Sequence, residues 1–562
     1  MTMSQEQRMQ GQPMIILGDD AQRMKDESAQ GHNISAARAV AESVRSTLGP
    51  KGMDKMLVTS LGDIVVTNDG VTILDEMDID NPTAEMVVEV AETQEEEAGD
   101  GTTTAVAIAG DLLKHAEDLL EQDLHPTAII KGFTLASEQA REELDEIAVD
   151  IESDDDETLE QVAGTAMTGK GAEQYSDHLS ELVVDAAQAV TVEADDGSTI
   201  VDLAFLKIET QTGDSPASSE LLEGAVLDKD PVHEDMPTTV EDANTLLVDE
   251  PLELSEADAD TQVSVTDPTQ LESFIEQEEQ ELRDMVDQIA DLGADVVLCQ
   301  KGIDDMVQHY LAKEGILAVR RVKRSDMEFL REVLGAKVIS DLSTATAEDL
   351  GTGTVDRDTD EELFYIEGTR DEAHGVTLLL RGSTDHVVDE IERGVNDALD
   401  VVGGALTSGQ VLPGGGAPEI EVAGRLREFA DSVSGRQQLA VEAYADALEV
   451  VPRVLAENAG YDSIDTLVDL RAAHSDGDEH AGINVHTGNI ENTFEAGIVE
   501  TPNAKQQALA SASEAANLVL KIDDIISAGD LSTEGDDEDA GGPGGGMGGG
   551  MGGMGGGMGG MM

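Results

Sequence analysis

The sequence has one cysteine, no tryptophan and few other aromatic residues. The lone thiol, Cys299, cannot form an internal disulfide, and without a second cysteine there is no CxxC metal or redox motif. Cys299 directly follows the apolar residues Val296–Leu298. This pattern predicts a buried strand, so we expect Cys299 to be structural rather than a nucleophile.

The sequence also lacks long apolar runs. No segment approaches the roughly 20 apolar residues that a membrane-spanning helix needs. The first residues, Met1–Glu6, do not resemble a secretory signal peptide. We therefore expect a soluble, cytoplasmic protein that has no membrane partner.

Basic residues are scarce: 33 Lys and Arg stand against 120 Asp and Glu, which gives a formal net charge of −87. Because nucleic-acid binding depends on stripes of Lys and Arg that neutralise phosphates, the composition argues against a nucleic-acid partner. The acidic residues are spread along the whole chain rather than gathered in one segment. Such a surface is typical of proteins that work in concentrated salt, where repulsion between like charges is screened.

With 562 residues the chain is too long for one hydrophobic core, so several domains are expected. Apolar spacing and capping residues predict helices over residues 33–48, 82–98, 104–124 and 126–147, and again over 387–402. The β-branched runs Ile64–Thr67 and Val71–Leu74 surround Asn68-Asp69-Gly70 and predict a β-hairpin. In that hairpin, turn chemistry alone accounts for Asp69.

The middle of the chain has a different pattern. Strand-like runs at Val296–Cys299, Ile316–Val319 and Lys337–Ser340 alternate with short helices, which predicts an α/β domain with parallel strands. Before it, residues 246–292 are poor in strands and contain a long amphipathic helix that starts at Asp267-Pro268. That helix either packs on its own domain or projects as an arm whose apolar stripe meets partners.

The segment Gly99–Thr104 combines two glycines, one carboxylate and three hydroxyls before an apolar helix. Helix N-termini with nearby glycines bind phosphates, and a single carboxylate suits a Mg²⁺ that keeps water and phosphate ligands. The alternative is a loop that ends one helix and caps the next. A second glycine-rich loop, Gly414–Gly416, permits the same close backbone approach, whereas Asp397 falls on the polar face of its helix.

Three other patterns give weaker evidence of function. Gly164–Lys170 imitates a P-loop, but Gly171 stands where a magnesium-binding hydroxyl belongs and the preceding residues predict helix, so we reject that interpretation. Lys170 remains either a charge sensor or a surface lysine. His474, His480 and His486 predict a solvated loop rather than a metal site. The Gly/Met repeats beyond residue 541 predict a disordered tail.

Five motifs, in order and with matching spacing, give the sequence a resemblance to the group II chaperonins of the archaeal thermosome type. They are Leu48–Leu57, Asn68–Gly70, Gly99–Thr104, Gln300–Asp305 and Leu412–Glu419. The resemblance covers residues 12–530 and implies a multidomain α+β fold. Its parts are a helical equatorial ATPase domain from both chain ends, a small α/β intermediate domain, and an α/β apical substrate-binding domain with a helical protrusion as lid. The implied boundaries are 1–152 and 412–535 (equatorial), 153–223 and 376–411 (intermediate), 224–375 (apical, protrusion 246–284) and 536–562 (tail).

The resemblance also implies site residues, with ATP and Mg²⁺ as ligands. Asp397 and Asp69 would be catalytic, and Asp100 would hold the metal. The implied nucleotide-binding residues are Leu48, Gly49, Pro50, Gly101, Thr102, Thr103, Thr104, Lys170, Gly415, Gly482 and Glu500. The implied partners are unfolded proteins, identical or paralogous subunits in a stacked double ring, and a prefoldin-type co-chaperone. Two other functions compete: a metal-dependent ATPase or kinase that acts on a small substrate, and a non-catalytic scaffold with a binding arm.

Overall fold

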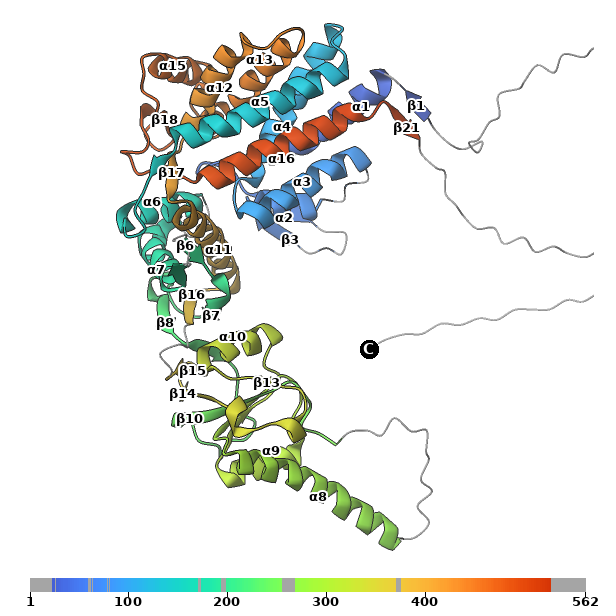
Figure 1. Cartoon of the computed structure of the whole chain (residues 1–562), viewed down its shortest axis with the longest axis vertical. Helices are drawn as coiled ribbons and strands as arrows, with labels where there is room; N and C mark the ends of the chain where they lie inside the picture. The colour runs from blue at the N-terminus through green and yellow to red at the C-terminus, as the bar shows by residue number, and fades with distance from the viewer. Residues whose placement is uncertain are drawn as a thin grey trace, which may run out of the picture.

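The computed structural model describes residues 23–526, with gaps at 26, 59–61, 63, 78, 80, 170–172, 194–198, 255–267 and 370–374. Its buried apolar residues form three large cores, one centred in each unit of the chain. Figure 1 shows the three units stacked along the long axis of the molecule. The predicted multidomain α+β architecture is confirmed.

The helical unit is built from both ends of the described chain, because residues 34–147 and 412–520 share one core. Its first part contains β1 (Arg23–Lys25), α1 (Glu27–Arg45), β2 (Lys55–Val58), β3 (Ile64–Thr67), α2 (Gly70–Asp75), α3 (Pro82–Ala98), α4 (Thr102–Glu121) and α5 (Pro126–Ile147). Its second part contains β17 (Gln410–Pro413), α12 (Ala417–Ala430), α13 (Gln437–Leu448), α14 (Val450–Asn458), α15 (Ser463–Ser475), β18 (Ala481–Asn484), β19 (Asn489–Asn492), β20 (Val499–Glu500), α16 (Pro502–Lys521) and β21 (Asp524–Ile526). Strands β1 and β21 pair antiparallel, so the two ends of the described chain meet.

The predicted hairpin is wrong in its second half. β3 pairs antiparallel with β2, whereas residues 70–75 form helix α2. Asp69 caps this helix, since its carboxylate accepts hydrogen bonds from the backbone N–H and the hydroxyl of Thr72. Ile73 and Leu74 are 1% exposed in the core of the helical unit. Packing and the cap outweigh the strand preference of the β-branched residues.

The middle unit consists of β4 (Val149–Asp150), α6 (Asp156–Met167), α7 (Ser176–Ala189), β5 (Thr191–Glu193), β6 (Thr199–Val201), β7 (Leu206–Thr212), β8 (Glu220–Glu223), β16 (Val376–Gly382) and α11 (Asp385–Ser408). Its main sheet has the order β7-β16-β8, with β16 parallel to β7 and antiparallel to β8. The chain enters this unit at β4 and leaves it at β17, and these two strands pair antiparallel. The two connections to the helical unit therefore lie side by side.

The sheet unit consists of β9 (Ala225–Asp228), β10 (Thr239–Val248), α8 (Pro268–Leu292), β11 (Val296–Cys299), α9 (Asp305–Glu314), β12 (Leu317–Val319), α10 (Arg324–Leu334), β13 (Val338–Ile339), β14 (Gly351–Asp358) and β15 (Leu363–Gly368). The three predicted strands, β11, β12 and β13, pair in parallel, with β11 and β13 on either side of β10 and β12 on β11. β14, β15 and β9 extend the sheet antiparallel. Leu246–Val248 are fully buried in β10, so the insertion starts after them rather than at residue 246.

Helix α8 projects from the sheet unit (Figure 1). Its C-terminal part packs on the unit through Leu282, Val286 and Ile289, while the acidic residues 276, 278 and 281 are exposed. The C-terminal part therefore packs on its own domain, the first of the two interpretations, and the arm whose apolar stripe meets partners stays a prediction. Residues 255–267, the centre of the predicted protrusion, lie outside the described residues, as does the Gly/Met tail. None of the described helices combines the length and the hydropathy that crossing a bilayer requires.

Cys299 is fully buried in β11, as the sequence predicts. Burial raises the pKa of its thiol to about 11, because the thiolate would be deprived of water. We expect the native protein to react with an aromatic disulfide reagent at pH 7.5 at least about tenfold more slowly than the unfolded protein, because thiolate and access are both lost. The measurement is absorbance after reagent addition, with and without guanidinium. Equal rates would show that this strand is open to solvent.

Candidate functional site

The Gly99–Thr104 segment joins two helices in a tight turn. Gly99 ends α3 and Gly101 caps α4, both with positive φ (62° and 84°), which favours glycine. The amide of Gln94 donates to the carbonyl oxygens of Asp100 (2.7 Å) and Ala504 (3.3 Å) and so fixes the turn against α16. The segment thus caps a helix and also presents the unpaired N–H groups at the start of α4 to the space beside it.

Two neighbours shape this helix start. The hydroxyl of Thr102 donates to the carboxylate of Glu95 at 2.8 Å, which holds a second carboxylate beside the start of α4. Thr103 lies against Gly70, where a built Cβ would come within 2.6 Å of the Thr103 hydroxyl oxygen. Gly70 directly follows Asp69, so the start of α2 and the start of α4 touch. Asp69 therefore lies beside the Gly99–Thr104 segment.

The loop after α1 forms a further wall. Gly49 has a φ of 78°, and a side chain there would overlap Leu455 on α14. The amide of Asn458 donates to the carbonyl of Leu48 at 2.8 Å and holds the loop on α14. Pro50 continues the loop, and a Cβ on Gly169 of the middle unit would lie 3.1 Å from Pro50 Cα.

The second glycine loop faces the first. The N–H of Gly414 donates to the carbonyl of Ile498 (2.8 Å), and the N–H of Ile483 donates to the carbonyl of Gly415 (2.9 Å). A Cβ on Gly482 would come within 2.6 Å of the carbonyl oxygen of Gly414. Only glycine permits these backbones to approach so closely. Gly482 therefore packs directly against the backbone of the Gly414–Gly416 loop.

These segments surround a cavity of about 740 Å³ between the helical and middle units. Of the residues named from the sequence, its lining includes Leu48, Gly49, Pro50, Asp69, Asp100, Gly101, Thr102, Thr103, Thr104, Asp397, Gly415 and Glu500. Asp397 comes from α11 of the middle unit, and every other residue in that set comes from the helical unit. Gly482 touches the lining loops without lining the cavity itself. Lys170 lies outside the described residues.

Several residues that matter to this site have no local sequence signal. Gln94, Glu95 and Lys505 belong to ordinary amphipathic helices, and their partners lie on other segments or loops. His474 is a correction: it is not on a solvated loop but on α15, with 6% of its side chain exposed. Its ring nitrogens lie 2.8 Å from the carboxylate of Glu421 and 2.8 Å from the carbonyl of Ala481. The P-loop imitation is rejected as predicted, because residues 164–167 lie within α6.

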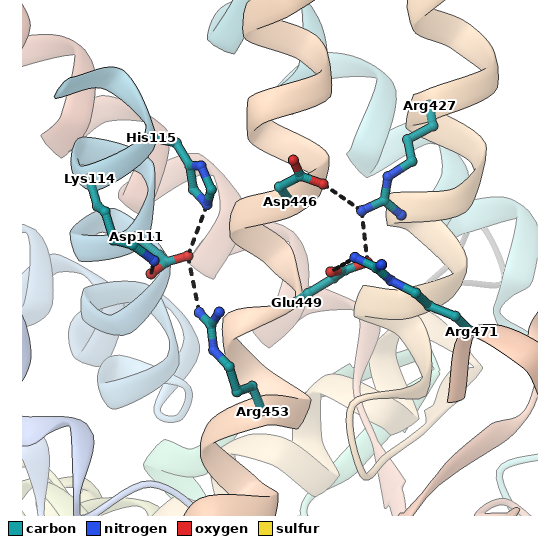
Figure 2. A network of polar contacts seen from close by, with 8 residues as sticks. All are labelled: Asp111, Lys114, His115, Arg427, Asp446, Glu449, Arg453 and Arg471. Atoms are coloured by element: carbon teal, nitrogen blue, oxygen red, sulfur yellow. Dashed lines mark hydrogen bonds and ion pairs between the residues drawn. The ribbon is translucent and has the colours of Figure 1, made fainter. Parts of the chain in front are cut away.

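Helix α14, which lines the cavity with Val451 and Leu455, is held from two sides by ion pairs (Figure 2). Asp111 on α4 is 5% exposed and accepts from Arg453 (3.2 Å) and Lys114 (3.0 Å), with His115 at 3.3 Å. Burial alone would raise the pKa of Asp111, but the hydrogen bond from His115 and the charges of Arg453 and Lys114 hold that pKa well below its ordinary value.

The second contact of α14 is at Glu449, where α13 ends and α14 begins. Glu449 is 3% exposed and accepts hydrogen bonds from Arg427 on α12 and Arg471 on α15, each at 2.7 Å. Asp446 adds a 2.7 Å bond to Arg427. The pKa of Arg427 is raised: burial would lower it, but the bonds to Asp446 and Glu449 outweigh burial. Together the two clusters fix the cavity wall against three other helices.

The donor set suits a magnesium nucleotide. Asp100 offers one carboxylate, and among the described residues no group of three or more His, Cys, Asp or Glu forms a closed metal cage. Mg²⁺ prefers such a site, because it keeps several waters and binds through one or two carboxylates and phosphates. Gly49, Gly101 and Gly415 all have positive φ and line the cavity with backbone atoms rather than side chains. The residues present therefore fit Mg²⁺ with a nucleoside triphosphate.

Comparison with known proteins gives the same family. Residues 40–530 match the model of the TCP-1/cpn60 chaperonin family. The chain is 69% identical over 533 residues to thermosome subunit beta of Halobacterium salinarum, covering 95% of this chain and 96% of the relative. It is also 69% identical over 537 residues to thermosome subunit 2 of Haloferax volcanii, with the same coverage.

Among solved structures, the open-state monomer of a group II chaperonin from Methanococcoides burtonii superposes with a TM-score of 0.60 at 42% identity. The match covers 75% of this chain and 100% of that structure. The two thermosome subunits, from Halobacterium salinarum and Haloferax volcanii, come from salt-loving archaea, in line with the acidic composition of this chain. The chain belongs to the TCP-1/cpn60 chaperonin family and is a group II chaperonin of the thermosome type.

Proposed function

We propose that the chain is a subunit of a ring-shaped, ATP-driven chaperone that encloses unfolded proteins and releases them folded. One observation carries the proposal: the cavity is lined by two glycine loops and a helix N-terminus of the helical unit together with Asp397 of the middle unit. Because the two units are joined by only two adjacent strands, a movement between them changes the distance from Asp397 to the rest of the site.

The proposed chemistry is hydrolysis of the terminal phosphoanhydride bond. Mg²⁺, when bound to Asp100, supplies positive charge that neutralises the phosphates. The N–H groups of Thr102–Thr104 and the loop at Gly49–Pro50 bind phosphate oxygens. Gly415 and Glu500 contact the nucleoside, and Gly482, which the sequence resemblance also assigned to the nucleoside, acts through its packing against the Gly414–Gly416 loop. Asp397 orients the attacking water and accepts its proton, while Asp69 lies beside that water. Lys170 senses the terminal phosphate. The site is complete only when Asp397 has arrived, which couples hydrolysis to closure.

The domain roles follow from the same proposal. The helical, middle and sheet units correspond to equatorial, intermediate and apical domains. The protrusion that contains α8 acts as a built-in lid, and the apical face binds unfolded proteins. The relatives' names, subunit beta and subunit 2, support rings built from more than one kind of subunit. Two stacked rings with roughly eight or nine subunits each are expected, the closed symmetry of such assemblies.

The assembly distinguishes this function from the competing ones. In molar salt with ATP and Mg²⁺, we expect a complex on the order of one megadalton, because rings of that size close with about 16 to 18 copies. Native mass spectrometry and negative-stain images of the same sample measure the mass and the ring shape. A monomer under these conditions would rule out the ring-shaped chaperone and leave the two competing functions, an ATPase or kinase that acts on a small substrate and a non-catalytic scaffold.

A further inference from the structure

A buried lysine lies between two carboxylates at the edge of the cavity. Lys505, on the first turn of α16, has 11% of its side chain exposed. Its ammonium lies 2.7 Å from Glu419, on the first turn of α12, and also pairs with Glu500 on β20. The Glu419 and Glu500 side chains are 4% and 24% exposed. One cation thus connects three segments that converge on the nucleotide cavity.

Lys505 is the one positive charge of this triad and faces two carboxylates. Burial alone would lower the pKa of Lys505, yet the two carboxylates hold it above its ordinary value. The Oε2 atom of Glu419 has no hydrogen-bond partner among the residues that the structure describes. Burial also raises the pKa of Glu500, an effect that the charge of Lys505 opposes. The pKa of Glu500 stays above its ordinary value, and Lys505 is the charge that favours its anionic form.

The position of Glu500 shows what the lysine achieves. β20 pairs with β17, with Glu500 opposite Leu412, and β17 leads directly into the Gly414–Gly416 loop. Lys505 engages the Oε2 atom of Glu500, whereas Oε1 lies 2.9 Å from the point where a Cβ on Gly414 would be. The carboxylate is thus fixed beside the glycine loop, with one oxygen used by the ammonium and the other turned to the loop.

We propose that Lys505 is a positioning residue for nucleotide binding: it fixes the Glu500 carboxylate beside the Gly414–Gly416 loop, where it accepts hydrogen bonds from the hydroxyls of a nucleoside. This rests on the proposed function, in which the cavity binds ATP. Lys505 then acts on affinity through Glu500 and contributes little to the hydrolysis step, since Asp397 and Asp100 lie on other segments.

A double-mutant cycle tests this in the full-length protein. Mg²⁺ and a fluorescent ADP are titrated into the wild type, Lys505→Met, Glu500→Gln and the double variant. We expect Lys505→Met and Glu500→Gln each to weaken binding at least about tenfold, equal to about 1.4 kcal/mol. The double variant should bind within about twofold of Glu500→Gln, because both changes remove one interaction. The KM for ATP should rise by a similar factor while kcat stays within about threefold.

Two controls keep the test decisive. Lys337→Met removes an exposed lysine paired with Asp349 in the sheet unit and should bind like the wild type. If Lys505→Met does not fold, the comparison is made between Glu419→Gln and Glu419→Gln/Lys505→Met. In both of these variants Glu419 is neutral, so removal of the lysine leaves only one buried carboxylate without its cation. In this pair the loss of Lys505 should again weaken binding about tenfold.

Three results would overturn the inference. Unchanged affinity in Lys505→Met would do so, as would a double variant whose loss is the product of the single losses, since Lys505 would then act without Glu500. A fall in kcat with constant KM would place Lys505 in hydrolysis instead. In each of these cases the wild type still binds nucleotide and the proposed function stands. A wild type that binds no nucleotide would overturn both.

Discussion

Replacing Asp397 with alanine should slow ATP hydrolysis at least about 100-fold, the usual loss when a catalytic base is removed. ATP binding should stay within about twofold of wild type, because the phosphate and nucleoside contacts come from other segments. Asp397 lies on α11 in the middle unit, whereas the remaining sequence-predicted lining residues belong to the helical unit. The measurements are steady-state phosphate release and binding of a fluorescent nucleotide.

The control for this experiment is Asp389→Ala. Asp389 is an exposed carboxylate on the same helix and does not line the cavity, so its loss should leave turnover close to wild type. Asp397→Asn separates two roles, because an amide can still orient water but cannot accept its proton. Turnover by Asp397→Ala equal to that of Asp389→Ala would remove Asp397 from the mechanism.

Asp111→Asn should destabilise the helical unit by about 3 kcal/mol, because it leaves Arg453 and Lys114 beside a buried site without their anion. In a unit of this size that corresponds to a fall in the thermal midpoint of roughly 6–12 °C. Asp118→Asn is the matched control, since Asp118 lies on the same helix and is exposed. Calorimetry at constant salt measures both. Equal midpoints for the two variants would show that the Asp111 cluster adds nothing to stability.

The same cluster predicts a pH dependence. The pKa of Asp111 is lower in the folded than in the unfolded chain, so the folded state binds fewer protons there. The stability from this group is therefore complete above the ordinary carboxyl pKa of about 4 and is lost as the pH falls below it. The difference between wild type and Asp111→Asn should shrink on acidification. A difference that grows toward low pH would contradict this sign.

Where the sequence carries caps and breakers, it predicts the fold well. Asn81-Pro82 starts α3, Gly99 and Gly101 separate α3 from α4, and His125-Pro126 starts α5, as expected. The prediction fails at residues 71–74, where intrinsic preference pointed to a strand. There the choice of helix depends on the Asp69 cap and on the burial of Ile73 and Leu74 against α1, α3 and α4, a packing that strand preference does not contain.

The candidate site shows the same division. Glycines and hydroxyls that must approach a ligand are visible in the sequence as short motifs, and they converge on one cavity. The groups that hold these motifs in place are not visible, because their partners are distant. Gln94 reaches Ala504 across 410 residues, and Lys505 reaches Glu419 across 86. Their roles become apparent only once the chain has folded and brought these partners together.

The shared core of the helical unit has a consequence for biosynthesis. Residues 34–147 pack against residues 412–520, so the first-made helices lack their partners until the last quarter of the chain has left the ribosome. At roughly 5–20 residues per second, the intervening residues take on the order of 10 to 50 seconds to make. During that time the face of α5 that packs on α12, α13 and α16, and the part of α4 that packs on α13 and α16, remain uncovered. The chain is thus, for part of its own synthesis, the kind of exposed apolar polypeptide that we propose the finished assembly binds.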